Sequence, residues 1–251
     1  MGLGVFNKLT REKFPQAADQ KKIAAGLEYA TKKHAGQKRL SGDPYIKHPV
    51  AVATLLAEWD MDVDSVVAGL LHDTVEDTDT EPSEIKEQFG EHVAMLVNGV
   101  TKVSHARAGR KDVTNYLPGT NENLSKLLIA TGSDVRVIII KLADRLHNLR
   151  TLEYQSPENQ LKKAHESLEV FGPLADRLNM GLVRTEIEDI SFSYLAPKRY
   201  NKLKNEMNRR LGAGKKKLNK VRAEVVAKLR EEKLDFEMDG RLKSIHSLHK
   251  K

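Results

Sequence analysis

The chain has 251 residues, carries a formal charge of +7 and contains no cysteine. This length allows one large domain or two small ones with a substantial core. The absence of cysteine excludes disulfides, thiolate zinc sites and cysteine nucleophiles. No apolar run reaches the roughly 18 residues of a membrane span, and the N-terminus is too weakly apolar for a secretory signal. We therefore expect a soluble cytoplasmic protein that does not enter a membrane.

The positive charge is concentrated at the C-terminal end. Residues 198–251 hold 18 Lys and Arg against 7 Asp and Glu, whereas residues 1–197 hold 24 against 28. A basic segment of this kind suits nucleic acid, an anionic ligand or a solvated helix, and charge alone does not distinguish them. Because no recognition motif accompanies it, we favour a solvated helix and expect no specific nucleic-acid partner.

The first predicted elements are helices separated by a turn. Apolar residues at helical spacing predict a helix over residues 16–37. Residues 38–45 have the Ser-Gly-Asp-Pro composition of a turn. Pro49 then suits the first turn of a helix over residues 50–59. His48, which precedes that helix, is most simply a cap or a core residue, but its neighbourhood makes it a candidate ligand.

The next helix begins near Met61–Asp64, and its apolar run leads directly into His72, Asp73, Glu76 and Asp77. If the helix continues through this stretch, His72 and Glu76 form one i, i+4 pair, and Asp73 and Asp77 form another. The two pairs then lie on neighbouring stripes of one helical face. An adjacent His and Asp offer a nitrogen and an oxygen ligand to one cation. A polar helix end is the alternative, but a His-Asp pair beside a buried stripe favours a metal site.

A polar stretch follows two further helices, which we predict over residues 82–89, ended by Gly90, and over residues 91–100. Residues 104–120 contain two glycines, a proline and a basic cluster. This stretch is long for an ordinary connection, so it is either disordered or a lid near the site. The sequence does not choose between these two interpretations.

Residues 135–151 form the second informative stretch. The run could pass for a buried strand, but its apolar positions follow steps of three and four and predict one long buried helix. Asp144 then lies among buried neighbours, which costs several kcal/mol unless it is paired or binds a cation. The alternative is a salt bridge to Lys141, Arg145 or Arg150. Asn148 and Thr151 follow on the same face, which suits a metal with a ligand better than a charge pair.

The remaining chain is also predicted to be helical. Residues 157–194 are predicted to form two amphipathic helices, with breaks marked by Pro173 and Gly181. A basic run over residues 199–229, interrupted by glycines at 212–214, predicts a helical hairpin. We find no internal repeat, so the predicted fold class is all-α.

The candidate ligands together make two imidazoles and two carboxylates from three segments: His48, His72, Asp73 and Asp144. Nitrogen and oxygen ligands without sulfur suit manganese, iron or magnesium, and zinc is possible. A metal held this way keeps positions for water and for a substrate phosphate, and lowers the pKa of the water. Glu76 and Asp77 are placed to orient or deprotonate that water. The predicted chemistry is hydrolysis of a phosphate ester.

Four longer motifs narrow this prediction. They are Arg39–Pro49 (RLSGDPYIKHP), Leu70–Thr78 (LLHDTVEDT), Gly99–Lys102 (GVTK) and Ile140–Leu152 (IKLADRLHNLRTL). In this order they resemble the N-terminal hydrolase domain of the RelA/SpoT homologues, an HD-domain helical phosphohydrolase fold. The resemblance covers nearly the whole chain and includes the segment Pro173–Leu178.

The resemblance implies a Mn²⁺-dependent removal of pyrophosphate from the 3′ position of ppGpp or pppGpp, which gives GDP or GTP. It implies that Mn²⁺ is held by His48, His72, Asp73 and Asp144. Glu76 and Asp77 would activate the attacking water and stabilise charge.

The resemblance also implies a binding site for the nucleotide. Arg39 would lie against the guanine as a planar cation on an aromatic ring. Ser41, Asn148 and Thr151 would contact the base or the ribose. Leu40 stands where the family frequently has a lysine.

We expect three parts along the chain. Residues 1–197 would form the HD-type hydrolase domain and residues 198–239 a basic helical linker. Residues 240–251 resemble the opening of the family's synthetase domain, whose catalytic acidic residues the sequence does not contain, so no synthetase activity is expected. Two alternatives remain: an HD-type phosphohydrolase for another nucleotide, or a regulatory domain that senses a nucleotide. The complete metal set argues against the second.

Overall fold

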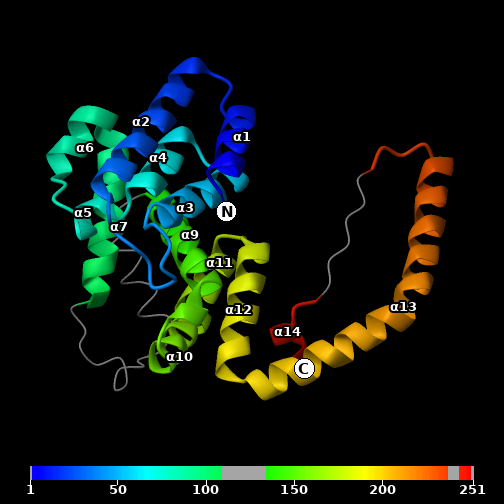
Figure 1. Ribbon diagram of the computed structural model, residues 1–251. Coiled ribbons are helices and arrows are strands. Elements are labelled where there is room, and N and C mark those ends of the chain that lie inside the picture. Colours follow the sequence, from blue (N-terminus) through cyan, green and yellow to red (C-terminus); the bar gives the residue numbers. More distant parts are fainter. Residues whose placement is uncertain (1, 109–133, 237–242, 250–251) are drawn as a thin grey trace.

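The computed structural model describes residues 2–108, 134–236 and 243–249, and within these ranges the regular elements are all helices (Figure 1). The all-α prediction is therefore confirmed. The helices are α1 (Leu3–Lys13), α2 (Ala17–Lys33), α3 (Lys47–Glu58), α4 (Val63–Leu71), α5 (Thr74–Asp77), α6 (Pro82–Phe89), α7 (Glu91–Ala108), α9 (Arg136–Arg150), η1 (Leu152–Tyr154), α10 (Pro157–Glu166), η2 (Ser167–Phe171), α11 (Gly172–Arg177), α12 (Gly181–Leu195), α13 (Pro197–Glu231) and α14 (Ile245–His249). None of the described helices is long and apolar enough to cross a bilayer.

The core is built around α3. Every residue of this helix from His48 to Ala57 is buried, because the segment is apolar on all sides. It packs against α1, α4 and α9, and α4 packs in turn against α2 and α7. This arrangement brings the start of α3, the end of α4 and the middle of α9 to one place.

The contact between α3 and α4 depends on a glycine. A Cβ added at Gly69 of α4 would lie 2.5 Å from Leu56 Cδ1 and 3.4 Å from the Cα of Ala53. Both neighbours belong to α3 and are completely buried. Only a residue without a side chain lets the two helices approach this closely.

Several predicted helices are found close to their expected bounds. The helix predicted over 16–37 is α2, which ends earlier, at Lys33, and the turn after it is closed by a β-bridge between Lys38 and Pro44. Helix α6 ends at Phe89, and the residue that caps it, Gly90, has a positive φ of 91°. The segment that could have passed for a strand is the helix α9.

The helix expected to continue through His72 does not. Helix α4 ends at Leu71, and α5 starts at Thr74 after a turn formed by His72 and Asp73. Asp62 caps α4 by accepting a hydrogen bond from the backbone N–H of Ser65 at 2.7 Å. The two i, i+4 pairs are therefore not on one continuous helix.

Other differences concern helix lengths. Helix α1 was not expected from the sequence, and α7 continues to Ala108, so residues 104–108 are helical rather than a loop. Residues 109–120 of the predicted loop lie outside the described residues. Between 157 and 195 the chain forms α10, a short π-helix η2, α11 and α12 instead of two helices.

The predicted basic hairpin is wrong. Helix α13 runs without interruption for 35 residues and extends away from the other helices as an arm, orange in Figure 1. The last described segment, α14, returns to the base of this arm and contacts both α12 and α13.

Candidate active site

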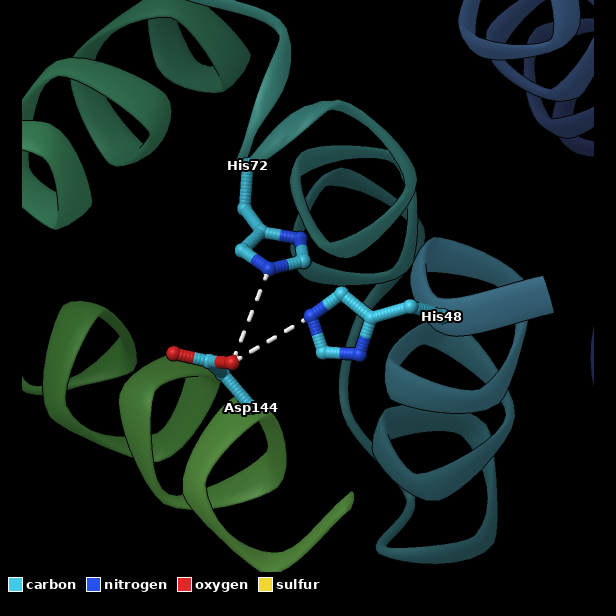
Figure 2. Close-up of side chains that lie close together, drawn as sticks. All are labelled: His48, His72 and Asp144. Atoms are coloured by element: carbon cyan, nitrogen blue, oxygen red, sulfur yellow. Dashed lines mark ion pairs between the residues drawn. The ribbon is translucent and has the colours of Figure 1, made fainter. Parts of the chain in front are cut away.

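Three helices bring two imidazoles and a carboxylate together. His48 comes from the first turn of α3, His72 from the end of α4 and Asp144 from the middle of α9, and the three point toward one another (Figure 2). The Nε2 atoms of His48 and His72 lie 3.3 Å and 3.9 Å from Asp144 Oδ1. Within the described part of the chain this group has the spacing to hold a metal ion, with ligand atoms within 4.8 Å of one another.

Asp73 completes the set of predicted ligands. Its Oδ1 lies 3.1 Å from His72 Nε2, and its Oδ2 lies 3.4 Å from His48 Nε2. The turn between α4 and α5 makes this possible, because it lets two consecutive side chains face the same point. The structure thus places all four predicted ligands in one cluster, which we call the His-Asp cluster.

The His72 ring has the form that a metal ligand requires. Its Nδ1 donates a hydrogen bond to the carbonyl oxygen of Gly69 at 2.9 Å, so in a neutral ring Nε2 carries the lone pair. Nε2 is buried, and none of the described groups forms a well-directed hydrogen bond to it. A buried nitrogen without such a partner, facing two carboxylates, is the arrangement a divalent cation would satisfy.

Asp144 also has the salt bridge that was the alternative to a metal. Lys141 Nζ lies 2.7 Å from Asp144 Oδ2, while the other oxygen, Oδ1, faces the imidazoles. The two oxygens therefore serve different partners. Arg145 and Arg150, the other possible partners, pair with Glu166 and Glu186 instead.

The charges of the cluster shift its pKa values. Burial opposes the charging of His72, but the carboxylates of Asp73 and Asp144 outweigh it and raise the pKa of His72 to about 9. Burial likewise opposes ionisation of Asp73, yet the two imidazoles hold its pKa well below the ordinary value. Burial also opposes ionisation of Asp144, but Lys141 and the two imidazoles outweigh it and lower the pKa of Asp144. The carboxylates thus carry the negative charge that a cation needs.

A pocket of about 230 Å³ opens beside the His-Asp cluster. It contains all four residues predicted to bind the substrate, together with further polar and aromatic side chains: Lys38, Arg39, Leu40, Ser41, Tyr45, Asn148, Thr151, Tyr154, Gln155 and Lys163. Arg39 donates to Asn148 Oδ1 at 2.9 Å and to Thr151 Oγ1 at 3.3 Å. Leu40 also lines this pocket and is exposed.

Asn148 joins this pocket to the cluster. Its amide nitrogen donates to Asp144 Oδ1 at 2.6 Å, while its amide oxygen accepts from Arg39. A ligand held in the pocket would therefore lie one side chain away from the cluster.

The residues predicted to handle water lie in α5. Asp77 is exposed, and its Oδ2 accepts a hydrogen bond from the Tyr45 hydroxyl at 2.7 Å. The same hydroxyl lies 2.8 Å from Asp73 Oδ2, so it links Asp77 to the cluster. Glu76 is exposed on α5, one residue before Asp77.

Three residues of the site had no predicted role: Tyr45, His147 and Lys163. Burial, with the carboxylates of Asp73 and Asp77, raises the pKa of the Tyr45 phenol. Burial, with the neighbouring His48 and Arg39 side chains, lowers the pKa of His147 to about 3. Burial also lowers the pKa of Lys163.

The sequence signal for His147 was its position three residues after Asp144, which puts both on one face of α9. Tyr45 and Lys163 carry no comparable signal.

A helical domain with a His, a His-Asp pair and a distant Asp meeting at one buried point has the architecture of an HD domain. Comparison with known proteins agrees with this class, since residues 26–181 match the HD domain family. The match covers more than half of the chain and includes every residue of the cluster.

Curated relatives narrow the class further. The chain is 44% identical over 241 residues to a bifunctional (p)ppGpp synthase/hydrolase RelA of Mycobacterium tuberculosis, covering 96% of this chain and 32% of the relative. It is 42% identical over 231 residues to a guanosine-3′,5′-bis(diphosphate) 3′-pyrophosphohydrolase of Aquifex aeolicus, covering 92% of this chain and 31% of the relative. It is 43% identical over 229 residues to a probable GTP pyrophosphokinase of Mycobacterium leprae, covering 91% and 28%.

A solved structure is also similar. It is described as a metazoan ortholog of SpoT that hydrolyses ppGpp and plays a role in starvation responses. The TM-score is 0.52 at 28% identity, and the alignment covers 73% of this chain and 98% of the other. The chain therefore belongs to the HD domain family and is a homologue of the RelA/SpoT proteins. It spans about a third or less of the length of these curated relatives.

Proposed function

We propose that the chain is a Mn²⁺-dependent 3′-pyrophosphohydrolase of (p)ppGpp, which releases pyrophosphate and leaves GDP or GTP. The observation that carries this proposal is the position of Asn148, which hydrogen-bonds both to the Asp144 carboxylate and to Arg39 in the pocket. Relatives named for this reaction support the choice of substrate.

Four side chains would hold the Mn²⁺: His48, His72, Asp73 and Asp144. The buried His72 Nε2, which carries the lone pair in the neutral ring, and the ionised carboxylates fit a divalent cation with mixed nitrogen and oxygen ligands. When bound, the metal supplies a Lewis acid for the phosphoryl oxygen and an acidified water. Manganese rather than another divalent ion is the choice that the family resemblance favours.

Proton transfer from the attacking water falls to Glu76 and Asp77. Both are carboxylates on α5, within one turn of the ligand Asp73. The Tyr45 hydroxyl, between Asp73 and Asp77, holds the Asp77 carboxylate close to the cluster. In this proposal Asp77 is oriented by Tyr45 while Glu76 takes the proton.

The pocket would bind the rest of the nucleotide. The Arg39 guanidinium is held by Asn148 and Thr151, so its flat face is fixed and can lie against guanine. Ser41, Asn148 and Thr151 would contact the base or ribose. Lys38 and Lys163 line the same pocket and supply positive charge for phosphate groups.

We also propose that the hydrolase activity resides in residues 1–197, with residues 198–239 as a linker. The extension of α13 away from the core supports this division. We place the reaction in the cytoplasm, with which the cysteine-free composition is compatible.

The test is to incubate the purified protein with ppGpp and Mn²⁺, with and without a chelator. We expect GDP and pyrophosphate only when the metal is present. His72→Ala should abolish turnover and metal retention together, whereas Glu76→Gln should keep the metal and lose most of the rate. Unchanged hydrolysis in His72→Ala would refute the site. Competition by GDP but not by ADP would support a guanine pocket, and equal competition would favour another nucleotide substrate.

A further inference from the structure

Another histidine, His147, contacts the candidate ligand His48 through a ring nitrogen. The Nδ1 atoms of His48 and His147 lie 2.7 Å apart, a hydrogen-bond distance. Their ring centroids are 4.9 Å apart and the planes are inclined by 38°. This contact uses the ring nitrogen of His48 that does not face Asp73 and Asp144.

Two ring nitrogens at this distance require one proton between them, since two lone pairs or two N–H groups would repel each other. His48 Nε2 is the atom that faces Asp73 and Asp144. If Nε2 gives its lone pair to a cation, the single proton of a neutral imidazole must be on Nδ1. That proton then points at His147 Nδ1, which must accept it.

The other candidate imidazole ligand, His72, already has its proton on Nδ1 and its Nε2 toward the carboxylates. His72 donates its Nδ1–H to the carbonyl of Gly69, and its Nε2 faces the cluster. His48 has the same orientation of Nε2, but its Nδ1 meets a side chain rather than a backbone carbonyl. A side-chain acceptor can be changed by mutation, which makes the contact testable.

We propose that His147 is a positioning residue that accepts a hydrogen bond from His48 Nδ1–H and so keeps the Nε2 lone pair of His48 directed at the metal. The inference rests on the proposed metal site. One face of helix α9 would then contribute two residues to the site. Asp144 would be a ligand, and His147, three residues later, would be the hydrogen-bond partner of the ligand His48.

Substitutions at position 147 separate positioning from packing. His147→Leu fills similar space without an acceptor, whereas His147→Asn places an oxygen or nitrogen at the position of Nδ1. A loss of the partner of a ligating histidine typically costs about 10–100-fold in metal affinity. We expect His147→Leu to weaken Mn²⁺ binding by about that factor, and His147→Asn to stay close to the wild-type affinity.

Mn²⁺ binding is measured by electron paramagnetic resonance of the free ion, which does not depend on turnover. The matched control is His165, an exposed histidine on the neighbouring helix α10. His165→Leu should bind Mn²⁺ as the wild type does. Melting temperatures in chelator show whether each variant folds. Equal affinity in His147→Leu and His165→Leu would overturn the proposal.

A second measurement uses the wild-type protein and does not depend on the stability of a variant. Ring-nitrogen NMR of the protein loaded with diamagnetic Zn²⁺ reports which nitrogen of His48 carries the proton. We expect a proton on Nδ1 and a metal shift on Nε2. A proton on His147 Nδ1 with an unprotonated His48 Nδ1 would overturn the assignment.

The proposal and the metal site fail in different ways. If wild-type and His72→Ala proteins bind Mn²⁺ equally, the metal site is wrong and the role of His147 falls with it. If His72→Ala loses the metal and His147→Leu keeps it, the metal site stands and only the positioning role is refuted.

Discussion

Tyr45 connects the two parts of the site through opposite ends of one side chain. Its ring stacks on His34, with centroids 4.7 Å apart, and lies 5.7 Å from the Arg39 guanidinium carbon. Its hydroxyl reaches the carboxylates of Asp73 and Asp77. One phenolic proton is shared between two acceptors, which keeps the two carboxylates near each other despite their charge.

Tyr45→Phe removes this proton and keeps the ring. We expect kcat for ppGpp hydrolysis to fall by about 10–100-fold, because Asp77 is no longer held beside the cluster. KM should change little, since the ring below Arg39 remains. Steady-state kinetics at saturating Mn²⁺ measure both constants. A rise in KM without a fall in kcat would place Tyr45 in substrate binding instead.

His72 makes the stability of the metal-free protein depend on pH. Its pKa is about 9 in the folded protein against an ordinary value of 6.5. The folded state therefore binds the proton more tightly, and the resulting stability is complete below about pH 6.5 and is lost as the pH rises through about 9. At the proposed metal site, binding would need the same Nε2 atom unprotonated, so we expect Mn²⁺ to stabilise the protein more strongly as the pH rises through this window.

The difference in melting temperature between Mn²⁺-loaded and chelator-treated protein should therefore widen from pH 6.5 to pH 9. Differential scanning fluorimetry under nitrogen, which prevents oxidation of the manganese, measures it. A difference that stays constant or shrinks over this range would contradict the link between His72 protonation and the metal.

At the scale of elements, apolar periodicity predicted the buried helices well. Helix α9 has apolar side chains at steps of three and four, and this pattern outweighed the β-branched run at its start. The sequence pattern gave a wrong prediction for residues 199–229, which lie outside the hydrophobic core. The glycines at 212–214 cost only about 1 kcal/mol each in a helix, and the rest of the 35-residue α13 tolerates them.

The site was predictable to the extent that chemistry marks residues in the sequence. His72 and Asp73 stand out as adjacent candidate ligands, and Asp144 stands out because it is a carboxylate within an apolar run. The contacts of Tyr45 and His147 depend on how α3, α5 and α9 pack. The sequence shows that His147 shares a face of α9 with Asp144. Its contact with His48 in another segment leaves no pattern in a single sequence.

Gly69 lets α3 and α4 come close enough to align their histidines. Gly69→Ala should destabilise the protein by about 1–3 kcal/mol, because the methyl group meets Leu56 and the backbone of Ala53. It should also weaken Mn²⁺ binding, since the carbonyl of residue 69 holds the His72 ring. Urea unfolding and Mn²⁺ titration measure the two effects.

Gly4→Ala is the matched control for this substitution. Gly4 is exposed in α1, and an added Cβ would meet nothing within 4 Å. Alanine there should be neutral or slightly stabilising, because it favours a helix. Equal effects of the two substitutions would show that Gly69 acts through helix propensity and not through packing.

At the scale of the molecule, the last described segment is attached through α12 to the helices that carry the His-Asp cluster. The Asp189 carboxylate accepts hydrogen bonds from the backbone N–H groups of Ile245 at 3.2 Å and His246 at 2.8 Å. His249 stacks on Phe192 with centroids 4.7 Å apart, and His246 is buried beside Glu188. Helix α12 also packs against α9, which carries Asp144.

Asp189→Ala should release α14 without disturbing the His-Asp cluster. The carboxylate caps the N-terminal N–H groups of a five-residue helix, and losing such a cap costs about 0.5–2 kcal/mol. Helix α14 is too short to persist in water without its docking contacts. Hydrogen exchange of residues 243–249 should therefore become faster, while Mn²⁺ affinity stays at the wild-type value. As a control, Glu224→Ala, on the exposed part of α13, should change neither the hydrogen exchange of residues 243–249 nor the Mn²⁺ affinity. Unchanged exchange in Asp189→Ala would show that the ring stacking alone holds the segment in place.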